Sequence, residues 1–150
     1  MAEPLTFLMG KFPAVLPADR RYARNHMWCQ PADDDVLRCG FTSYAVRLMQ
    51  DVYFLDWHVD AGATVQEKQL IGHIETSKAM ADLFAPLAGT ITRFNPELLK
   101  DPSAINVDNY GAGWLFDLAG AAGETLSAEE YYQFLDANWE KTQNMLKGHM

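Results

Sequence analysis

The sequence is poor in cysteine and histidine. It contains two cysteines, Cys29 and Cys39, and four histidines in 150 residues. Two cysteines are too few for a disulfide framework, and no histidine spacing completes a metal site with them, so we predict no metal centre. We expect both thiols to be small buried apolar side chains. Whether they can form a bridge depends on a strand register that the sequence leaves open.

Long apolar runs and basic clusters are also missing. No run reaches membrane-spanning length, and the N-terminus carries the acid Glu3 without the basic region of a secretory signal. We therefore predict a cytoplasmic protein without membrane contact. Lys and Arg number 12 against 20 Asp and Glu, which gives a net charge of −8. The longest basic cluster is Arg20-Arg21, so nucleic-acid binding is not expected. The acidic charge either promotes encounters with basic partner proteins or only aids solubility.

Short apolar or alternating segments, separated by turn residues, predict a mainly β domain. The expected strands cover residues 22–30, 36–40, 51–59, 90–94 and 114–118. A turn at residues 31–35 is expected between the first two strands. Thr42 or Ser43 is the predicted N-cap of a short helix over residues 44–49. Asn95-Pro96 begins a second helical turn, with the proline at its first position.

Both ends of the chain extend beyond this β domain, which we place at residues 25–120. Residues 1–24 are expected to form an extension that packs on the core through its apolar side chains, namely Phe7, Leu8, Met9, Phe12, Val15 and Leu16. Residues 121–150 form the other end. Ser127 and Glu130 make a capping box there, and the apolar positions that follow have helical spacing. This pattern predicts an amphipathic helix at about 128–146, which either lies on the domain or binds a partner.

Lys78 lies in the most informative segment of the chain. Two mostly apolar runs, 71–76 and 79–84, flank the two-residue break Ser77-Lys78. This pattern predicts two strands joined by a tight hairpin with the lysine at its tip. One interpretation is a solvated surface charge. The other is an attachment point, because amide formation would remove the positive charge and add an acyl group.

An ordered series of motifs decides between these interpretations. The series is Tyr22, Asn25-His26 and Trp28; residues 40–45; Gly62; residues 75–79 and 82–86; Gly89; residues 95–98; Pro102; Ile105-Asn106; and residues 110–115. It covers about two thirds of the chain, and its order makes it more specific than any single motif. Residues from about 22 to 118 resemble the H protein of the glycine cleavage system, a family of lipoyl carriers.

The resemblance implies a barrel-sandwich hybrid fold of the lipoyl or biotinyl type, to which the residues themselves add the short helices and the C-terminal amphipathic helix predicted above. It also implies lipoic acid, attached covalently to Lys78. Lipoyl attachment in this family is associated with Gly62, Glu75 and Asp82, which lie sixteen and three residues before the lysine and four after it. We expect Gly62 to allow a tight turn beside the hairpin. The two acids would flank the lysine where a lipoate ligase reads them, or else be solvated charges at strand ends.

Such a protein is a carrier subunit and not an enzyme, because the chemistry belongs to the cofactor. The sequence offers no nucleophile–base set and no phosphate-binding glycine loop. Therefore His26, His58 and His73 are interpreted as side chains on strand faces. A biotin carrier has a similar fold, but biotinyl domains resemble Met-Lys-Met at the hairpin, where Ser77 and Ala79 flank the lysine here. A carrier fold that has lost its cofactor is disfavoured by the retained glycine and acids.

Several residues depart from the family pattern. Residues 26–28 read His-Met-Trp instead of His-Glu-Trp, and residues 56–58 read Asp-Trp-His instead of acid-leucine-proline. The extension at residues 1–18 and the helix predicted after Ser127 lengthen the chain at both ends, and Cys29 and Cys39 are also uncharacteristic. These departures resemble the H-protein-related lipoate-binding proteins of cytoplasmic sulfur oxidation, which work with a heterodisulfide-reductase-like complex. The resemblance favours an arm that carries sulfur. The alternative is the glycine cleavage carrier, which takes an aminomethyl group between glycine decarboxylase and aminomethyltransferase and is reoxidised by dihydrolipoyl dehydrogenase.

Overall fold

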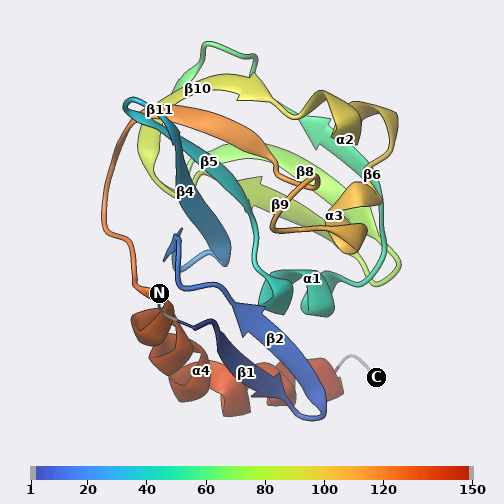
Figure 1. The fold of residues 1–150 in the computed structure, drawn as a ribbon. Helices are drawn as coiled ribbons and strands as arrows, with labels where there is room; N and C mark the ends of the chain where they lie inside the picture. The colour runs from blue at the N-terminus through green and yellow to red at the C-terminus, as the bar shows by residue number, and fades with distance from the viewer. Residues whose placement is uncertain (1–2, 149–150) are drawn as a thin grey trace.

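Two antiparallel β-sheets that face each other form the body of the protein (Figure 1). The computed structural model describes the backbone of residues 3–148 and the side chains up to Asn144. The larger sheet has the order β3-β4-β5-β11-β10-β7, with bounds Arg21–Tyr22, Met27–Asp33, Val36–Phe41, Phe116–Ala122, Ala88–Phe94 and Thr64–Val65. The smaller sheet has the order β6-β8-β9, with bounds Val52–Trp57, Leu70–Thr76 and Met80–Phe84. This architecture confirms the predicted mainly β fold class.

Alternation along the strands builds the main core between the two sheets. On β6, Leu55 and Trp57 pack inward, while the alternate residues Phe54 and Asp56 are exposed, Phe54 by 43%. The Trp57 ring stacks on Phe94 of β10, with ring centroids 4.6 Å apart, and meets Phe116 of β11 edge-on at 5.8 Å. The ring of Trp57 therefore packs into the interior between the sheets, and the residue is only partly exposed.

Three short helices lie between strands: α1 Ser43–Met49, α2 Pro96–Lys100 and α3 Ala104–Val107. The predicted caps of the first two are present. The Thr42 hydroxyl accepts a hydrogen bond from the amide of Ala45 at 3.2 Å, and the Asn95 side chain accepts one from the amide of Glu97 at 3.0 Å. The third helix was not predicted, because a single turn is too short to show a helical period.

A hairpin and a long helix form a second layer at one end of the sandwich (Figure 1). Its elements are β1 Leu5–Met9, β2 Phe12–Leu16 and α4 Ala128–Gly148. The hairpin lies between the two helices, because β2 contacts α1 and β1 contacts α4. Phe7 and Leu16 of the hairpin are buried in a second apolar cluster with Tyr131 and Leu135 of α4. The predicted amphipathic helix thus lies on the body of the protein.

Six apolar residues of the N-terminal segment were expected to pack on the core, and three of them are exposed instead. These are Leu8 at 61%, Phe12 at 48% and Val15 at 41%. The first and the last point away from the core because alternate side chains of a strand lie on opposite faces. Phe12 lies at the hairpin turn, where the guanidinium of Arg47 covers its ring at 3.2 Å from the centroid. The prediction was wrong for these three because it did not foresee strand pairing.

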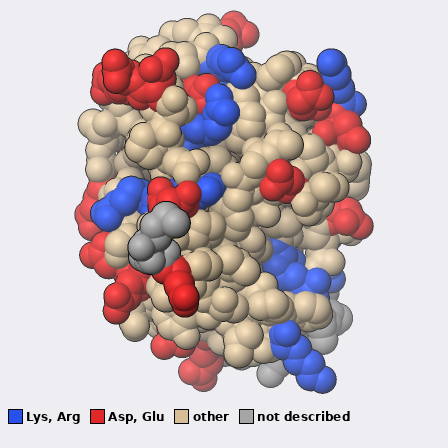
Figure 2. Space-filling model, viewed as in Figure 1, with Lys and Arg blue, Asp and Glu red and all other residues tan. Residues whose placement is uncertain are grey.

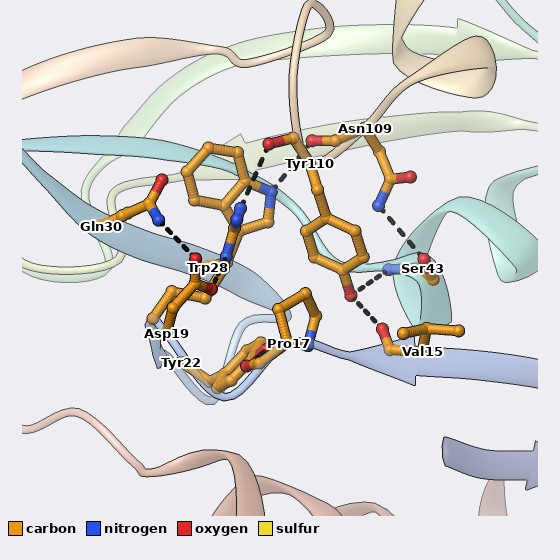
Figure 3. A network of polar contacts seen from close by, with 10 residues as sticks. Val15, Pro17, Asp19, Tyr22, Trp28, Gln30, Ser43, Asn109 and Tyr110 are labelled. Carbon is orange, nitrogen blue, oxygen red and sulfur yellow. Dashed lines mark hydrogen bonds and ion pairs between the residues drawn. The ribbon is translucent and has the colours of Figure 1, made fainter. Parts of the chain in front are cut away.

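Hydrogen bonds join the N-terminal segment to the sandwich (Figure 3). The Tyr110 hydroxyl donates to the carbonyl of Val15 and accepts from the amide of Ser43 at the start of α1. The indole N–H of Trp28 donates to the carbonyl of Asn109 at 3.0 Å. One loop, at residues 109–110, therefore connects β2, β4 and α1.

The first predicted strand, 22–30, is two strands in the structure. β3 ends at Tyr22, and a turn brings the chain back into β4 with His26 in a left-handed conformation at φ 69°. β4 continues through Pro31, so the predicted turn at 31–35 shrinks to residues 34 and 35. The proline is tolerated there because β3 pairs with β4 only at Trp28 and Cys29, which leaves one side of the later residues without a strand.

The two cysteines lie directly opposite each other on β4 and β5. Both thiols are free and buried, with 3.8 Å between their sulfur atoms. The hydrogen bond to Cys29, together with burial, raises the pKa of the Cys39 thiol well above its usual value. The expectation of small buried apolar side chains is confirmed. Within residues 3–148, no helix combines the length and the apolar character needed to cross a membrane.

Candidate functional site

β8 and β9 form the predicted hairpin around Lys78. The amide of Thr76 donates to the carbonyl of Ala79 at 2.9 Å, so Ser77 and Lys78 are the two central residues of a four-residue turn. Lys78 is exposed, and no salt bridge among the described residues involves its ammonium. The turn therefore presents an accessible lysine to solvent from a paired β scaffold.

The side chain of Thr76 holds this turn in shape. Its hydroxyl donates to the carbonyl of Ala79 at 3.0 Å and accepts from the amides of Lys78 and Ala79 at 3.2 Å. The amide of Ser77 donates to the carbonyl of Asp51 at 2.9 Å, which ties the tip to the chain just before β6. Neither central residue has a positive φ, unlike the turns that two-residue hairpins favour. The buried threonine supplies the hydrogen bonds that fix this alternative geometry.

Glu75 and Asp82 both lie on the outward face of the smaller sheet. Asp82 pairs with His73 directly across β8 and β9, and Glu75 follows His73 by two residues. Because paired residues and residues two apart point the same way, the three side chains share one face. Asp82 is exposed and Glu75 is partly exposed. The two acids are thus accessible to a modifying enzyme on both strands of the hairpin, and their part in recognition stays a prediction.

Gly62 lies at the other end of the smaller sheet from Lys78. The first residue of β6, Val52, pairs with Thr76 beside the turn, and the last, Trp57, pairs with Gly72. The loop after β6 therefore begins away from the hairpin tip, and the amide of Gly62 donates to the carbonyl of Ile91 on β10. Its φ of 97° explains the glycine. The prediction of a turn beside the hairpin was wrong, because strand direction decides which loops are neighbours.

An apolar pocket of about 190 Å³ opens between β9 and α1. Its apolar lining comes mainly from these elements and from Met27 and Phe41 of the larger sheet, and its polar lining is Asn25, His26 and Asp82. Asp82 is four residues from Lys78, which corresponds to roughly 13 Å along the strand. A flexible chain attached to the lysine therefore has an apolar recess within its surroundings.

His26 adds a neutral polar group to this pocket. Its Nδ1 atom lies 2.8 Å from the hydroxyl of Tyr131, and that hydroxyl lies 2.9 Å from Oγ1 of Thr42. Burial lowers the pKa of His26 to about 4 and raises the pKa of Tyr131 well above its usual value. Both side chains are therefore uncharged near neutral pH, and they join β4 and the α1 cap to α4.

Sequence reasoning missed Thr76, His26 and the pocket as parts of the site. The threonine carried a local signal, since a hydroxyl just before a two-residue turn is suited to bind the turn amides. The other features carried none, because His26 and Tyr131 are 105 residues apart in the chain. Figure 2 shows acidic and basic side chains interspersed on one face, with uncharged atoms over most of it.

Comparison with known proteins agrees with this architecture. The model of the family "Glycine cleavage H-protein" matches residues 20–142. The chain is 37% identical over 119 residues to a probable glycine cleavage system H protein of Natronomonas pharaonis, covering 77% of this chain and 93% of that protein. It is 36% identical over 124 residues to the glycine cleavage system H protein of Mycobacterium avium, with the same coverage. The crystal structure of such a protein from Mycobacterium marinum superposes with a TM-score of 0.70 at 38% identity, covering 77% of this chain and 95% of that one.

The two facing sheets with their short helices define the class of β carrier domains that hold a lipoyl group. Within that class, the chain belongs to the glycine cleavage H-protein family. Members of this family carry lipoate covalently attached to a lysine and serve as carrier subunits. The match extends through residue 142, so most of α4 belongs to the family fold. The sequence interpretation of this helix as a departure from the family is corrected accordingly.

Proposed function

We propose that the protein is a cytoplasmic lipoyl carrier of glycine cleavage, with Lys78 as the attachment point. The observation that carries this proposal is the exposed lysine at the tip of the β8–β9 hairpin in a chain of the H-protein family. When bound, lipoate supplies a dithiolane that accepts electrons and holds the transferred group. The protein's partners in this proposal are a lipoate ligase, glycine decarboxylase, aminomethyltransferase and dihydrolipoyl dehydrogenase.

The residues around the lysine suit this modification. Thr76 fixes the backbone of the turn from which Lys78 projects, and no ion pair among the described residues competes for its ammonium. Glu75 and Asp82 lie on the accessible face, where a ligase can bind both strands of the hairpin. The pocket beside β9 offers a mostly apolar surface to the chain tethered at the lysine, and His26 in its lining is uncharged near neutral pH. Tethering raises the local concentration of the carried group at each partner.

Intact-mass analysis tests the attachment point. The protein coexpressed with lipoate ligase and lipoate is expected to gain the mass of one lipoyl group. Lys78→Arg is expected to abolish the gain, while Lys68→Arg, at another exposed lysine, leaves it intact. A lipoylated Lys78→Arg variant, or an unmodified wild-type chain under these conditions, would contradict the proposal.

Reconstitution tests the pathway. Lipoylated protein is combined with glycine, a pyridoxal-phosphate-dependent glycine decarboxylase, tetrahydrofolate and aminomethyltransferase. Dihydrolipoyl dehydrogenase and NAD+ are included to reoxidise the reduced arm. Release of carbon dioxide that depends on the lipoylated carrier supports glycine cleavage. A carrier that is fully lipoylated yet inactive with these partners would reject this pathway and leave the attachment point standing.

A sulfur carrier for a heterodisulfide-reductase-like complex is the second candidate. The residues that favour it are the departures at positions 56–58 and the added N-terminal hairpin. Trp57 weakens this argument, because its ring packs against Phe94 and Phe116 between the sheets, which reduces the surface it offers to partners. His58 remains as an exposed difference. The named relatives are all glycine cleavage proteins, and they support the first candidate. Transfer of sulfane sulfur to the lipoylated protein, without aminomethyl transfer, would reverse this order.

A further inference from the structure

Two histidines and a carboxylate meet on the outward face of β6 and β8, away from the lysine turn. The Nε2 atom of His58 lies 2.8 Å from Nδ1 of His73 and 3.7 Å from Oδ2 of Asp56. One ligand atom from each of the three residues lies within 4.8 Å of the other two. The proposed carrier function assigns no role to this cluster, so an inference about it stands independently.

The sheet register creates the cluster from residues that are distant in the chain. Asp56 pairs with His73 across β6 and β8. The chain continues past β6 in the same ladder, because the amide of His58 donates to the carbonyl of Ile71 at 2.8 Å. Asp56 and His58 are two residues apart and share a face, with His73 facing them from the neighbouring strand. The backbone hydrogen bonds of the sheet therefore hold all three side chains in place.

We propose that Asp56, His58 and His73 form a binding site for a divalent transition metal of the zinc type. Bonds of about 2.05 Å at tetrahedral angles put neighbouring ligand atoms about 3.3 Å apart. The separations of 2.8 and 3.7 Å bracket this value, so small side-chain rotations bring the three atoms onto one ion.

The ligand types select the class of ion. Imidazole nitrogens suit zinc, cobalt, nickel and copper, whereas magnesium and calcium prefer oxygen ligands. Three protein ligands leave the fourth position of a tetrahedral ion open to water or to an outside ligand. His58 and Asp56 side chains are 37% and 55% exposed, which leaves that position open to solvent.

Metal binding needs no change of net charge on the two rings. In the metal-free pair, one of the two facing nitrogens carries the hydrogen of their hydrogen bond. On binding, that N–H moves to the other nitrogen of the same ring, and each facing nitrogen offers its lone pair to the ion. The ring of Phe54, with its centroid 5.6 Å from that of His73, limits the space in which this histidine can turn.

Zinc titration of the full-length chain tests the site. Lys78→Arg is the background, because a dihydrolipoyl arm would itself bind zinc through its thiols. Competition against a chromophoric chelator is expected to show one equivalent of zinc per chain. His58→Ala and His73→Ala are each expected to weaken binding by more than about tenfold, since a lost ligand costs at least as much as a lost outer contact.

Matched variants separate this site from other donors. Asp56→Ala should weaken binding, whereas Asp60→Ala, an exposed acid nearby, and His149→Ala should leave the Kd unchanged.

Cobalt provides a spectroscopic check, because thiolate ligation from Cys29 and Cys39 gives an intense ultraviolet charge-transfer band that nitrogen and oxygen ligands lack. Unfolding curves without metal show whether each variant folds, and His58→Gln and His73→Gln replace any alanine variant that does not.

The outcomes are distinct. The site is established if the protein binds one equivalent of zinc, if His58→Ala and His73→Ala lose this binding, and if Asp60→Ala and His149→Ala keep it. Absence of binding at millimolar zinc, equal affinity in the histidine variants, or a thiolate band with cobalt overturns it. Each of these results is independent of whether Lys78 becomes lipoylated.

Discussion

The partly buried His26 of the pocket predicts a specific pH dependence of stability. The pKa of His26 is about 4 in the folded protein, against 6.5 for an unhindered side chain, because burial disfavours its charged form. The unfolded chain therefore takes up a proton first as the pH falls from 6.5 toward 4. Since the unfolded state then binds more protons than the folded one, the free energy of unfolding decreases through this window and levels off below it.

The size of the effect follows from the two pKa values. A shift of the pKa from 6.5 to about 4 lowers the free energy of unfolding by at most about 3 kcal/mol at low pH. Between pH 7 and pH 5, the linkage relation makes the loss about 2 kcal/mol. Such a loss is a large share of the stability of a domain of this size.

Urea unfolding at pH 7, 6 and 5 measures this loss. His26→Asn is the reference, because asparagine stays neutral and tolerates the left-handed backbone that His26 adopts. The carboxylates and the other histidines titrate in both proteins, so the difference between the two pH profiles isolates His26. The wild type is expected to lose about 2 kcal/mol more than the variant between pH 7 and pH 5. Parallel profiles would refute the argument that this ring is desolvated in the folded state.

Three further predictions concern the turn, the helix contact and the thiols. Thr76→Val removes the hydroxyl that binds the lysine turn. We expect this variant to lower the free energy of unfolding by about 1–3 kcal/mol and to slow lipoylation. The control Thr64→Val, at an exposed residue, should change both quantities far less. Equal lipoylation rates in the two variants would contradict this role. Tyr131→Phe leaves Nδ1 of His26 without its hydrogen-bond partner and removes one contact of the Thr42 hydroxyl, which keeps its bond from the amide of Ala45. We expect this variant to be destabilised by about 1–3 kcal/mol in denaturant unfolding, and unchanged stability would show the contacts to be dispensable. Cys29 and Cys39 should react with a thiol reagent only as fast as the protein unfolds, and rapid labelling of the folded chain would show that they are accessible.

The lysine hairpin was predictable because its information is local. Two apolar runs around Ser77-Lys78 determine the strands and the turn, and the structure pairs them in that register. The caps at Thr42 and Asn95 were predictable for the same reason, since each side chain bonds an amide two or three residues ahead. The amphipathic spacing after Ser127 likewise indicated a helix with one buried face.

Other features depended on pairings that a single sequence does not contain. The N-terminal hairpin was overlooked because its prolines weakened the strand pattern, although β1 and β2 pair from Leu5 to Leu16. The sequence predicts Gly62 beside the lysine turn because the two positions belong to one motif. In the structure, β6 runs away from the lysine turn, and Gly62 follows in the loop after the far end of β6.

By itself, therefore, the sequence determined the family, the lysine at its hairpin tip and the helix at its C-terminal end, because strand alternation, turn chemistry and capping act between residues a few positions apart. Only the tertiary structure decided that burial keeps His26 uncharged near neutral pH, that the pocket opens between β9 and α1, and that Asp56, His58 and His73 converge. Desolvation and ligand convergence arise when distant segments exclude water from each other or align across a sheet, and that depends on register and packing.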